Sequence, residues 1–236
     1  MSPSALFLFV ILTAAVIAGG LIFRAYKRDI GLARAAARRG SRMVDTDIGP
    51  VEYADEGAGM PLLSIHGAGG GHDQGLANVF DLVGNGFRII APSRFGYLRT
   101  PVPGDTSSAA QADAHAALLD SLKINRVIVV GASAGARSAV EFAIRHPGRA
   151  VALILIVPAI YAPTEPVAVE GSGTSVLALR LVEKGADFGW WALAKIAPPI
   201  LLRFLGVRSE LLASASEAEW ARQHFLNCAT NPIRFT

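Results

Sequence analysis

The chain has 236 residues, of which 52% are hydrophobic and 17% are charged, and its mean hydropathy is +0.40. This composition is too apolar for a disordered protein and too polar for a protein with several membrane spans. The formal charge is +3, but seven basic residues lie between residues 24 and 42, which leaves 15 basic and 18 acidic residues elsewhere. Because the basicity is local, a globular domain that binds nucleic acid is disfavoured. The single cysteine, Cys228, excludes an internal disulfide framework.

The N-terminal segment has the features of a membrane anchor. Residues 5–23 are 19 uncharged residues, long enough as a helix to cross the hydrocarbon core of a bilayer. A cleaved signal peptide carries its basic residues before the apolar run, whereas here they follow it. We therefore predict an anchor over residues 1–23 and a basic juxtamembrane segment over residues 24–42, in a single-pass protein with a cytoplasmic globular part. The basic segment either lies on anionic headgroups or only tethers the domain.

The middle of the chain alternates strand patterns with helical patterns. This order predicts an α/β fold with a mostly parallel sheet and flanking helices over residues 43–159, followed by a helical cap over residues 160–236. The last three strand patterns are apolar throughout, as expected for strands buried on both faces. Strands are expected at residues 43–47, 51–55, 62–65, 88–91, 126–130 and 152–157, and helices near 75–82, 108–122, 134–146, 174–184, 190–205 and 217–228.

A nucleophile elbow is the strongest motif in the sequence. Gly131-Ala132-Ser133-Ala134-Gly135 lies between a strand pattern and a helical pattern, which is the context that a G-x-S-x-G elbow requires. The sharp turn leaves no room for side chains at the two glycines and lifts the serine to the C-terminal edge of the sheet. The start of the helix favours negative charge that develops on a substrate. We predict that Ser133 is a nucleophile; the alternative is a structural glycine-rich turn.

A second glycine-rich segment is expected at the same edge of the sheet. His66-Gly67-Ala68-Gly69-Gly70-Gly71 directly follows the strand pattern at residues 62–65. We predict that the backbone N–H of Ala68, or as second choice that of Gly69, pairs with the N–H of Ala134 to hold an oxyanion. The spacing of phosphate-binding and dinucleotide-binding loops is absent from this segment. The sequence therefore predicts no cofactor and no metal site.

Four segments together resemble the α/β-hydrolase fold superfamily: HGAGGG at residues 66–71, APSRFGYLRTP at 91–101, GASAG at 131–135 and RHPGR at 145–149. The resemblance covers about residues 43–159 and continues into what resembles the helical cap of this superfamily. It implies hydrolysis of an ester, epoxide, haloalkane or carbon–carbon bond without a cofactor. A serine at the elbow disfavours the haloalkane and epoxide branches, because these form an alkyl ester on a carboxylate. Acyl-enzyme chemistry is what the resemblance then implies.

The resemblance also implies that an acid and then a histidine follow the serine along the chain. After Ser133 the chain has two histidines, His146 and His224, and one aspartate, Asp187. His146 is expected at the far end of the elbow helix, too distant to take the serine proton. Asp187 and His224 have the right order but lie in the predicted helical cap, so they are weak candidates.

The sequence after residue 160 lacks counterparts of the two further strands that the resemblance implies. The strand at residues 152–157 is then expected at an edge of the sheet with an apolar surface. We therefore expect the 236 residues to be an incomplete form of a hydrolase. The three histidines that precede the serine are expected to be structural; these are His66, His72 and His115.

Two functional hypotheses follow from these observations. The first is a membrane-anchored serine hydrolase that acts on a small hydrophobic ester or a related acyl or carbon–carbon bonded substrate. The second is a non-catalytic binding or scaffold protein that retains the elbow. Neither motif defines the substrate or the oligomeric state, because specificity depends on the shape of the pocket. The hydrophobic preference is inferred from aromatic residues of the predicted cap, for which ordinary packing is an equally good explanation; these are Phe188, Trp190, Trp191 and Phe204.

Overall fold

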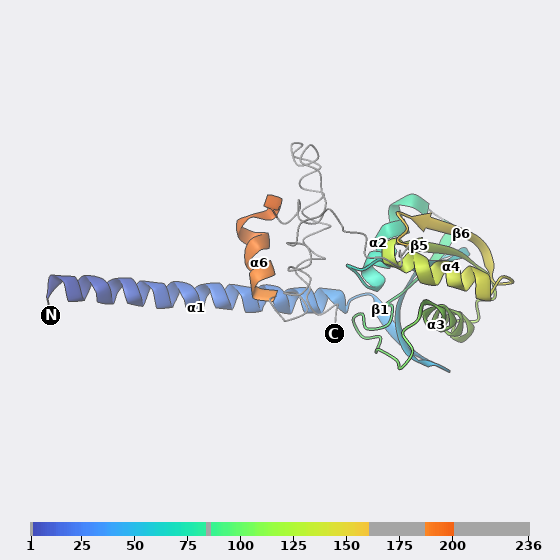
Figure 1. Cartoon of the computed structure of the whole chain (residues 1–236), viewed down its shortest axis with the longest axis horizontal. Coiled ribbons are helices and arrows are strands. Elements are labelled where there is room, and N and C mark those ends of the chain that lie inside the picture. Colours follow the sequence, from blue (N-terminus) through green and yellow to red (C-terminus); the bar gives the residue numbers. More distant parts are fainter. Residues whose placement is uncertain (1, 84–85, 161–186, 201–236) are drawn as a thin grey trace, which may run out of the picture. The chain divides into compact units, whose positions relative to one another are not determined.

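A computed structural model of the chain describes residues 2–83, 86–160 and 187–200 (Figure 1). The chain divides into two compact units, which are considered separately below. One unit combines Met1–Ala36 with Lys184–Asn231, and the other combines Ala37–Glu183 with Pro232–Thr236.

Six strands of the second unit form one sheet in the order β1-β2-β4-β3-β5-β6. β2 pairs antiparallel with both β1 and β4, whereas β4, β3, β5 and β6 are parallel to one another. The predicted fold class, a mostly parallel sheet with flanking helices, is confirmed. The strands extend over β1 (Ser41–Thr46), β2 (Gly49–Gly57), β3 (Met60–Ile65), β4 (Phe87–Pro92), β5 (Val127–Ala132) and β6 (Ala150–Ile156).

Helices pack on both faces of this sheet, and alternate side chains of each inner strand serve the two faces. In β5, Val127 and Val129 belong to the cluster that includes residues of α3 (Ser108–Ser121) and α4 (Ala136–Arg145). Ile128 and Val130 belong to the cluster that includes α2 (His72–Val83). Because successive side chains of a strand point to opposite faces, a strand covered on both sides must be apolar throughout.

β6 departs from the burial on both faces that its apolar sequence predicts. Among the described strands it pairs only with β5, so it lies at an edge of the sheet. Its side chains Val151, Leu153 and Ile154 are exposed. The expectation of two-sided burial is therefore wrong for this strand, because no further described strand or helix covers its outer surface. An apolar edge strand, by contrast, was expected at this position.

The first unit begins with one long helix, α1 (Pro3–Ala37), which runs through the apolar segment and most of the basic segment without a break. The apolar side chains between Leu6 and Phe23 are exposed. Over Pro3–Ala33 the helix is long and apolar enough to cross a bilayer, a property that signal sequences share.

α6 (Asp187–Ile196) packs on α1 within the same unit. Tyr26 and Ile30 of α1 form a buried cluster with Trp191 of α6. Asp29 accepts a hydrogen bond from Nε1 of Trp191 at 3.2 Å and pairs with Lys195 at 2.9 Å. The helix predicted over residues 190–205 is thus present as far as Ile196, is interrupted at Ala197 and resumes at residues 198–200; residues 201–205 lie outside the described part. The helices predicted near 174–184 and 217–228 lie wholly outside it.

Candidate active site

The turn between β5 and α4 has the geometry of a sharp elbow. Ser133 has a φ of +48°, in the left-handed region that costs a residue with a side chain of the order of 1 kcal/mol or more. Ser133 is exposed, whereas the flanking Gly131 and Gly135 are buried. A Cβ at Gly131 would lie 2.5 Å from Cβ of Ala139 and 2.9 Å from Cα of Ala136. The glycine at this position therefore lets α4 begin directly against the end of β5.

Gly135 has an equally tight environment on the other side of the elbow. A Cβ there would lie 2.4 Å from the carbonyl oxygen of His66 and 2.7 Å from that of Ile65. Both atoms belong to the backbone at the end of β3, which cannot move without disturbing the sheet. The two glycines thus allow Ser133 to lie between the C-terminal ends of β5 and β3, at the edge of the sheet that the sequence predicts for it.

The loop after β3 lies beside the serine and is held by the side chains of Gln74 and Tyr97. A Cβ at Gly67 would lie 3.1 Å from Cβ of Ser133, so the loop backbone passes close to the serine side chain. The N–H of Gly67 donates to Oε1 of Gln74 at 3.0 Å. The hydroxyl of Tyr97 donates to the carbonyl oxygen of Ala68 at 3.1 Å. These bonds fix the backbone of the loop without using the N–H of Ala68.

The direction of the peptide between Gly67 and Ala68 follows from its carbonyl group. The oxygen of Gly67 accepts a hydrogen bond from Nδ1 of His66 at 2.7 Å, with a longer contact from Nη2 of Arg94 at 3.5 Å. In a trans peptide the N–H points opposite to the carbonyl, so the N–H of Ala68 points away from His66 and Arg94. No described residue accepts a hydrogen bond from it.

His66 is bound at both ring nitrogens. The backbone N–H of Arg94 donates to Nε2 of His66 at 2.9 Å, so this nitrogen carries no proton and Nδ1 carries one. Burial, with a smaller contribution from the charge of Arg94, lowers the pKa of His66 to about 3. The ring is therefore a neutral cross-link between two loops, in agreement with the structural role expected for it.

The other described histidines also have polar partners away from Ser133. Nε2 of His72 donates to the carbonyl oxygen of Arg39 at 3.2 Å, and Nε2 of His146, at the end of α4, lies 3.0 Å from Oδ1 of Asp113. His115 of α3 lies 3.4 Å from Oγ of Ser138, and burial lowers the pKa of His115 to about 3.

Within the described part of the chain, no histidine or carboxylate makes a hydrogen bond with the side chain of Ser133. Of the weak candidates of the sequence, Asp187 begins α6 in the other unit, and His224 lies outside the described residues. The three predicted site residues Ser133, Ala68 and Ala134 lie at one edge of the sheet, on the loop after β3 and the turn after β5. The described residues also contain no cluster of three His, Cys, Asp or Glu side chains that would hold a metal ion.

A buried carboxylate that the sequence analysis missed supports the loop after β4. Glu52 of β2 is fully buried and accepts hydrogen bonds from Oγ of Ser93 at 3.0 Å and from Nε of Arg99 at 2.7 Å. Burial alone would raise the pKa of Glu52, but the nearby ring of His72, whose Nδ1 lies 3.8 Å from Oε1, and the hydrogen bonds from Arg99 outweigh it and lower this pKa to about 2. Glu52 lies between the buried apolar residues Val51 and Tyr53, and nothing in the strand pattern marks it as paired.

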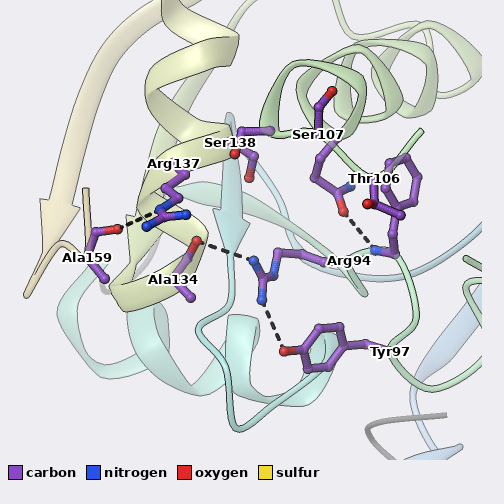
Figure 2. Close-up of a pocket in the computed structure, with 11 residues that line it drawn as sticks. Arg94, Tyr97, Thr106, Ser107, Ala134, Arg137, Ser138 and Ala159 are labelled. Carbon is purple, nitrogen blue, oxygen red and sulfur yellow. Dashed lines mark hydrogen bonds between the residues drawn. The ribbon is translucent and has the colours of Figure 1, made fainter. Parts of the chain in front are cut away.

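A pocket of about 340 Å³ lies next to the elbow, and Figure 2 shows its side chains. Ala134, the residue after Ser133, is part of its wall, as is Ala159, whose N–H donates to the carbonyl oxygen of Ser133 at 3.1 Å. No motif in the sequence predicts the polar side chains of this pocket. The remaining lining residues are Arg94, Phe95, Tyr97, Thr106, Ser107, Ser108, Gln111, Arg137 and Ser138.

Comparison with known proteins agrees with this geometry. Residues 60–173 match the family described as the alpha/beta hydrolase fold. The hydrolase YcgS of Bacillus subtilis, described as uncharacterized, is 37% identical over 123 residues, which cover 48% of this chain and 41% of that protein. The 2-hydroxymuconate semialdehyde hydrolase of Pseudomonas sp. CF600 is 37% identical over 107 residues, which cover 43% of this chain and 38% of that protein. The chain thus spans about two fifths of the length of these curated relatives.

A solved structure extends the match beyond the region of sequence similarity. The alpha/beta hydrolase fold protein from Nakamurella multipartita superposes with a TM-score of 0.55 at 26% identity. The superposition covers 83% of this chain and 71% of that structure.

Proposed function

Because the chain belongs to the α/β-hydrolase fold superfamily, we propose that it is a serine hydrolase with Ser133 as its nucleophile. The observation that carries the proposal is the conformation of the elbow. Ser133 has a positive φ although it is not glycine, and its two flanking glycines are packed against backbone and side-chain atoms that exclude a Cβ. A purely structural turn gains nothing from keeping an exposed serine in a strained conformation, whereas a nucleophile must be presented in this way.

The proposed chemistry is acyl transfer to the serine hydroxyl. Oγ of Ser133 attacks the acyl carbon, and the carbonyl oxygen takes up negative charge as the tetrahedral intermediate forms. The N–H groups of Ala68 and Ala134 stabilise this charge. Ala134 lies at the start of the helix, where N–H groups precede the first intrahelical bonds. The proton of the serine must pass to a base, for which Asp187 and His224 remain the candidates in the order of the superfamily.

The proposed substrate is a small acyl compound, either an ester or a ketone cleaved at a carbon–carbon bond. One relative is described as a hydrolase of 2-hydroxymuconate semialdehyde. The pocket beside the elbow is large enough for a small molecule of this kind. Most residues that line this pocket have polar side chains, but much of their exposed surface is apolar, so the hydrophobic preference inferred from aromatic cap residues stays a prediction. Phe188 and Trp191 instead pack with Tyr26 of α1.

We also propose that α1 holds the protein in a membrane with the globular part on the cytoplasmic side. The exposed apolar surface between Leu6 and Phe23, followed by basic residues, supports this arrangement. In carbonate extraction the intact chain should stay in the membrane fraction; intact chain in the soluble fraction would contradict the anchor. A shorter mature mass would instead indicate cleavage as a signal sequence.

The orientation has its own test. A cysteine introduced by Arg38→Cys in a Cys228→Ser background should resist a membrane-impermeant thiol reagent in intact cells and react after permeabilisation. Labelling in intact cells would reverse the topology.

A binding or scaffold protein is the second candidate, because no described histidine or carboxylate contacts Ser133. A serine-directed fluorophosphonate probe separates the two functions. Labelling that is lost in Ser133→Ala, but kept in a Ser121→Ala control on the exposed end of α3, supports the hydrolase. The absence of labelling in folded protein supports the binding protein.

A further inference from the structure

Among the described residues, the wall of the pocket beside the elbow carries positive charge and no acid. Of these lining residues only Arg94 and Arg137 are charged, and the others are hydroxyl, amide, aromatic or alanine side chains. Figure 2 shows the two guanidinium groups on either side of Ala134. Arg94 is partly withdrawn from water, where a positive charge is stabilised chiefly by a nearby negative group, whereas Arg137 is exposed at the mouth of the pocket and can be reached by a ligand from solvent.

Arg94 is the inner of these two cations and binds only neutral oxygens. Its Nη1 donates to the carbonyl oxygen of Ala134 at 3.3 Å, and its Nη2 donates to the hydroxyl of Tyr97 at 3.2 Å. Its Nε is buried and has no hydrogen-bond partner among the described residues. The ring of Tyr97 lies 5.0 Å from the guanidinium carbon and compensates part of the charge. No described carboxylate lies within ion-pair distance of this side chain.

Arg137 supplies donors that point to no acceptor in the described structure. It lies in the first turn of α4, and its Nε donates to the carbonyl oxygen of Ala159 at 3.2 Å. This bond fixes the plane of the guanidinium, while its two Nη atoms have no acceptor among the described residues. An oriented guanidinium with a free edge is suited to bind a carboxylate through two parallel hydrogen bonds.

The neutral polar side chains of the pocket are arranged so that donors remain. Oε1 of Gln111 accepts from the N–H of Phe95 at 2.7 Å, which leaves the amide nitrogen of Gln111 without a partner among the described residues. Oγ of Ser107 accepts from the N–H of Ala110 at 3.1 Å, so its own hydrogen is available. At both residues the protein backbone uses an acceptor of the side chain, and a donor is left open toward the pocket.

We propose that this pocket binds a carboxylate group of the substrate, with Arg137 as the direct ligand and Arg94 as the inner charge. The substrate class is then an acyl compound with a carboxylate at the end remote from the bond that is cleaved. That the bound compound is a substrate depends on the proposed hydrolase function, whereas the binding of a carboxylate does not. Arg94 also bonds to the backbone of the elbow, so it ties the charged pocket to the turn that carries Ser133.

The test measures binding rather than turnover, in the full chain with Ser133→Ala so that nothing is cleaved. Monomethyl glutarate and dimethyl glutarate have similar size and differ by one charge. Titration calorimetry should show the monoester binding at least about tenfold more tightly, with the difference shrinking at high salt. Equal affinities, or no binding of the monoester, would overturn the proposal.

Two arginine variants assign the effect to the pocket. Arg137→Gln should weaken binding of the monoester by about tenfold or more and leave the diester unchanged, since a charged hydrogen-bond partner is lost. Arg145→Gln removes the same charge from the same helix, but at a residue already paired with Asp113, and should change neither affinity. Equal effects of the two variants would show a general charge effect and refute the pocket. If methyl phosphate binds as tightly as the monoester, the carboxylate assignment is refuted.

Fluorophosphonate labelling of the unsubstituted protein keeps this result separate from the proposed function. If the protein is labelled but binds the monoester and the diester equally, it is a hydrolase whose pocket does not select an anion. Preference for the monoester without labelling describes an anion-binding protein that does not hydrolyse. The two failures are therefore distinguishable.

Discussion

The elbow helix begins so close to the end of β3 that a Cβ at Gly135 would lie 2.4 Å from the carbonyl oxygen of His66. The carbonyl oxygen of His66 and the Cα of Gly135 both belong to the backbone, so neither residue could relieve such a contact by changing a rotamer. It explains why the second glycine of the motif is required for packing as well as for the turn itself.

The first prediction concerns this contact. Gly135→Ala should destabilise the protein by about 1–3 kcal/mol, because the added methyl group forces β3 and α4 apart. Gly148→Ala is the matched control, since a Cβ at Gly148 has no neighbour within 4 Å. Urea unfolding followed by far-UV circular dichroism measures both. Equal midpoints for the two variants would show that the elbow tolerates a side chain at residue 135.

The second prediction concerns the buried carboxylate of Glu52. Glu52→Gln should cost about 1.5–3 kcal/mol, because the buried hydroxyl of Ser93 and the donors of the more exposed Arg99 lose their charged acceptor. Asp113→Asn removes a carboxylate from the partly exposed pair with Arg145 and should cost less than about 1 kcal/mol. Comparison of the two unfolding free energies checks the difference. Similar costs would mean that burial does not govern these pairs.

The sequence predicted the elements of the α/β unit well because they follow from local and periodic signals. Glycine spacing predicted the elbow, and the apolar run of residues 126–130 predicted β5. Glu52 and the arginine-lined pocket were not predictable in this way. A carboxylate within a strand pattern does not reveal that Arg99, 47 residues later in the chain, will reach it. Likewise, Arg94 and Arg137 line the same pocket only because the loop after β4 and the first turn of α4 lie at one edge of the sheet.

The third prediction is a pH dependence of stability between pH 7 and 5. Burial lowers the pKa of both His66 and His115 from 6.5 to about 3. Below pH 6.5 the unfolded chain takes up protons that the folded chain does not, so the stability contributed by these residues is complete above pH 6.5 and falls as the pH decreases. Each histidine contributes a slope of up to about 1.4 kcal/mol per pH unit.

Urea unfolding at several pH values tests this slope. Glu52 contributes in the same direction only below about pH 4.5, because its own pKa is lowered from 4.5 to about 2. His115→Gln should therefore reduce the slope between pH 7 and 5 by about half, whatever it does to stability at pH 7. A wild-type protein with the same stability at pH 7 and pH 5 would show that the buried histidines are not neutral as described.

The last prediction uses a thiol to probe the elbow independently of a catalytic base. A cysteine introduced by Ser133→Cys in a Cys228→Ser background ionises by itself and reports the local electrostatic potential. The start of α4 and the charge of Arg94, which bonds to the next residue, Ala134, both favour the thiolate. We expect the pH profile of iodoacetamide alkylation to give a thiol pKa at least about one unit below the usual 8.5. Ser121→Cys in the same background places the thiol at the C-terminal end of α3, where the helix dipole opposes ionisation, and its pKa should not be lowered. A thiol at residue 133 that resists alkylation, or that titrates like the one at residue 121, would contradict an exposed elbow with a positive potential. The assignment of Ser133 as nucleophile would then lose its physical basis.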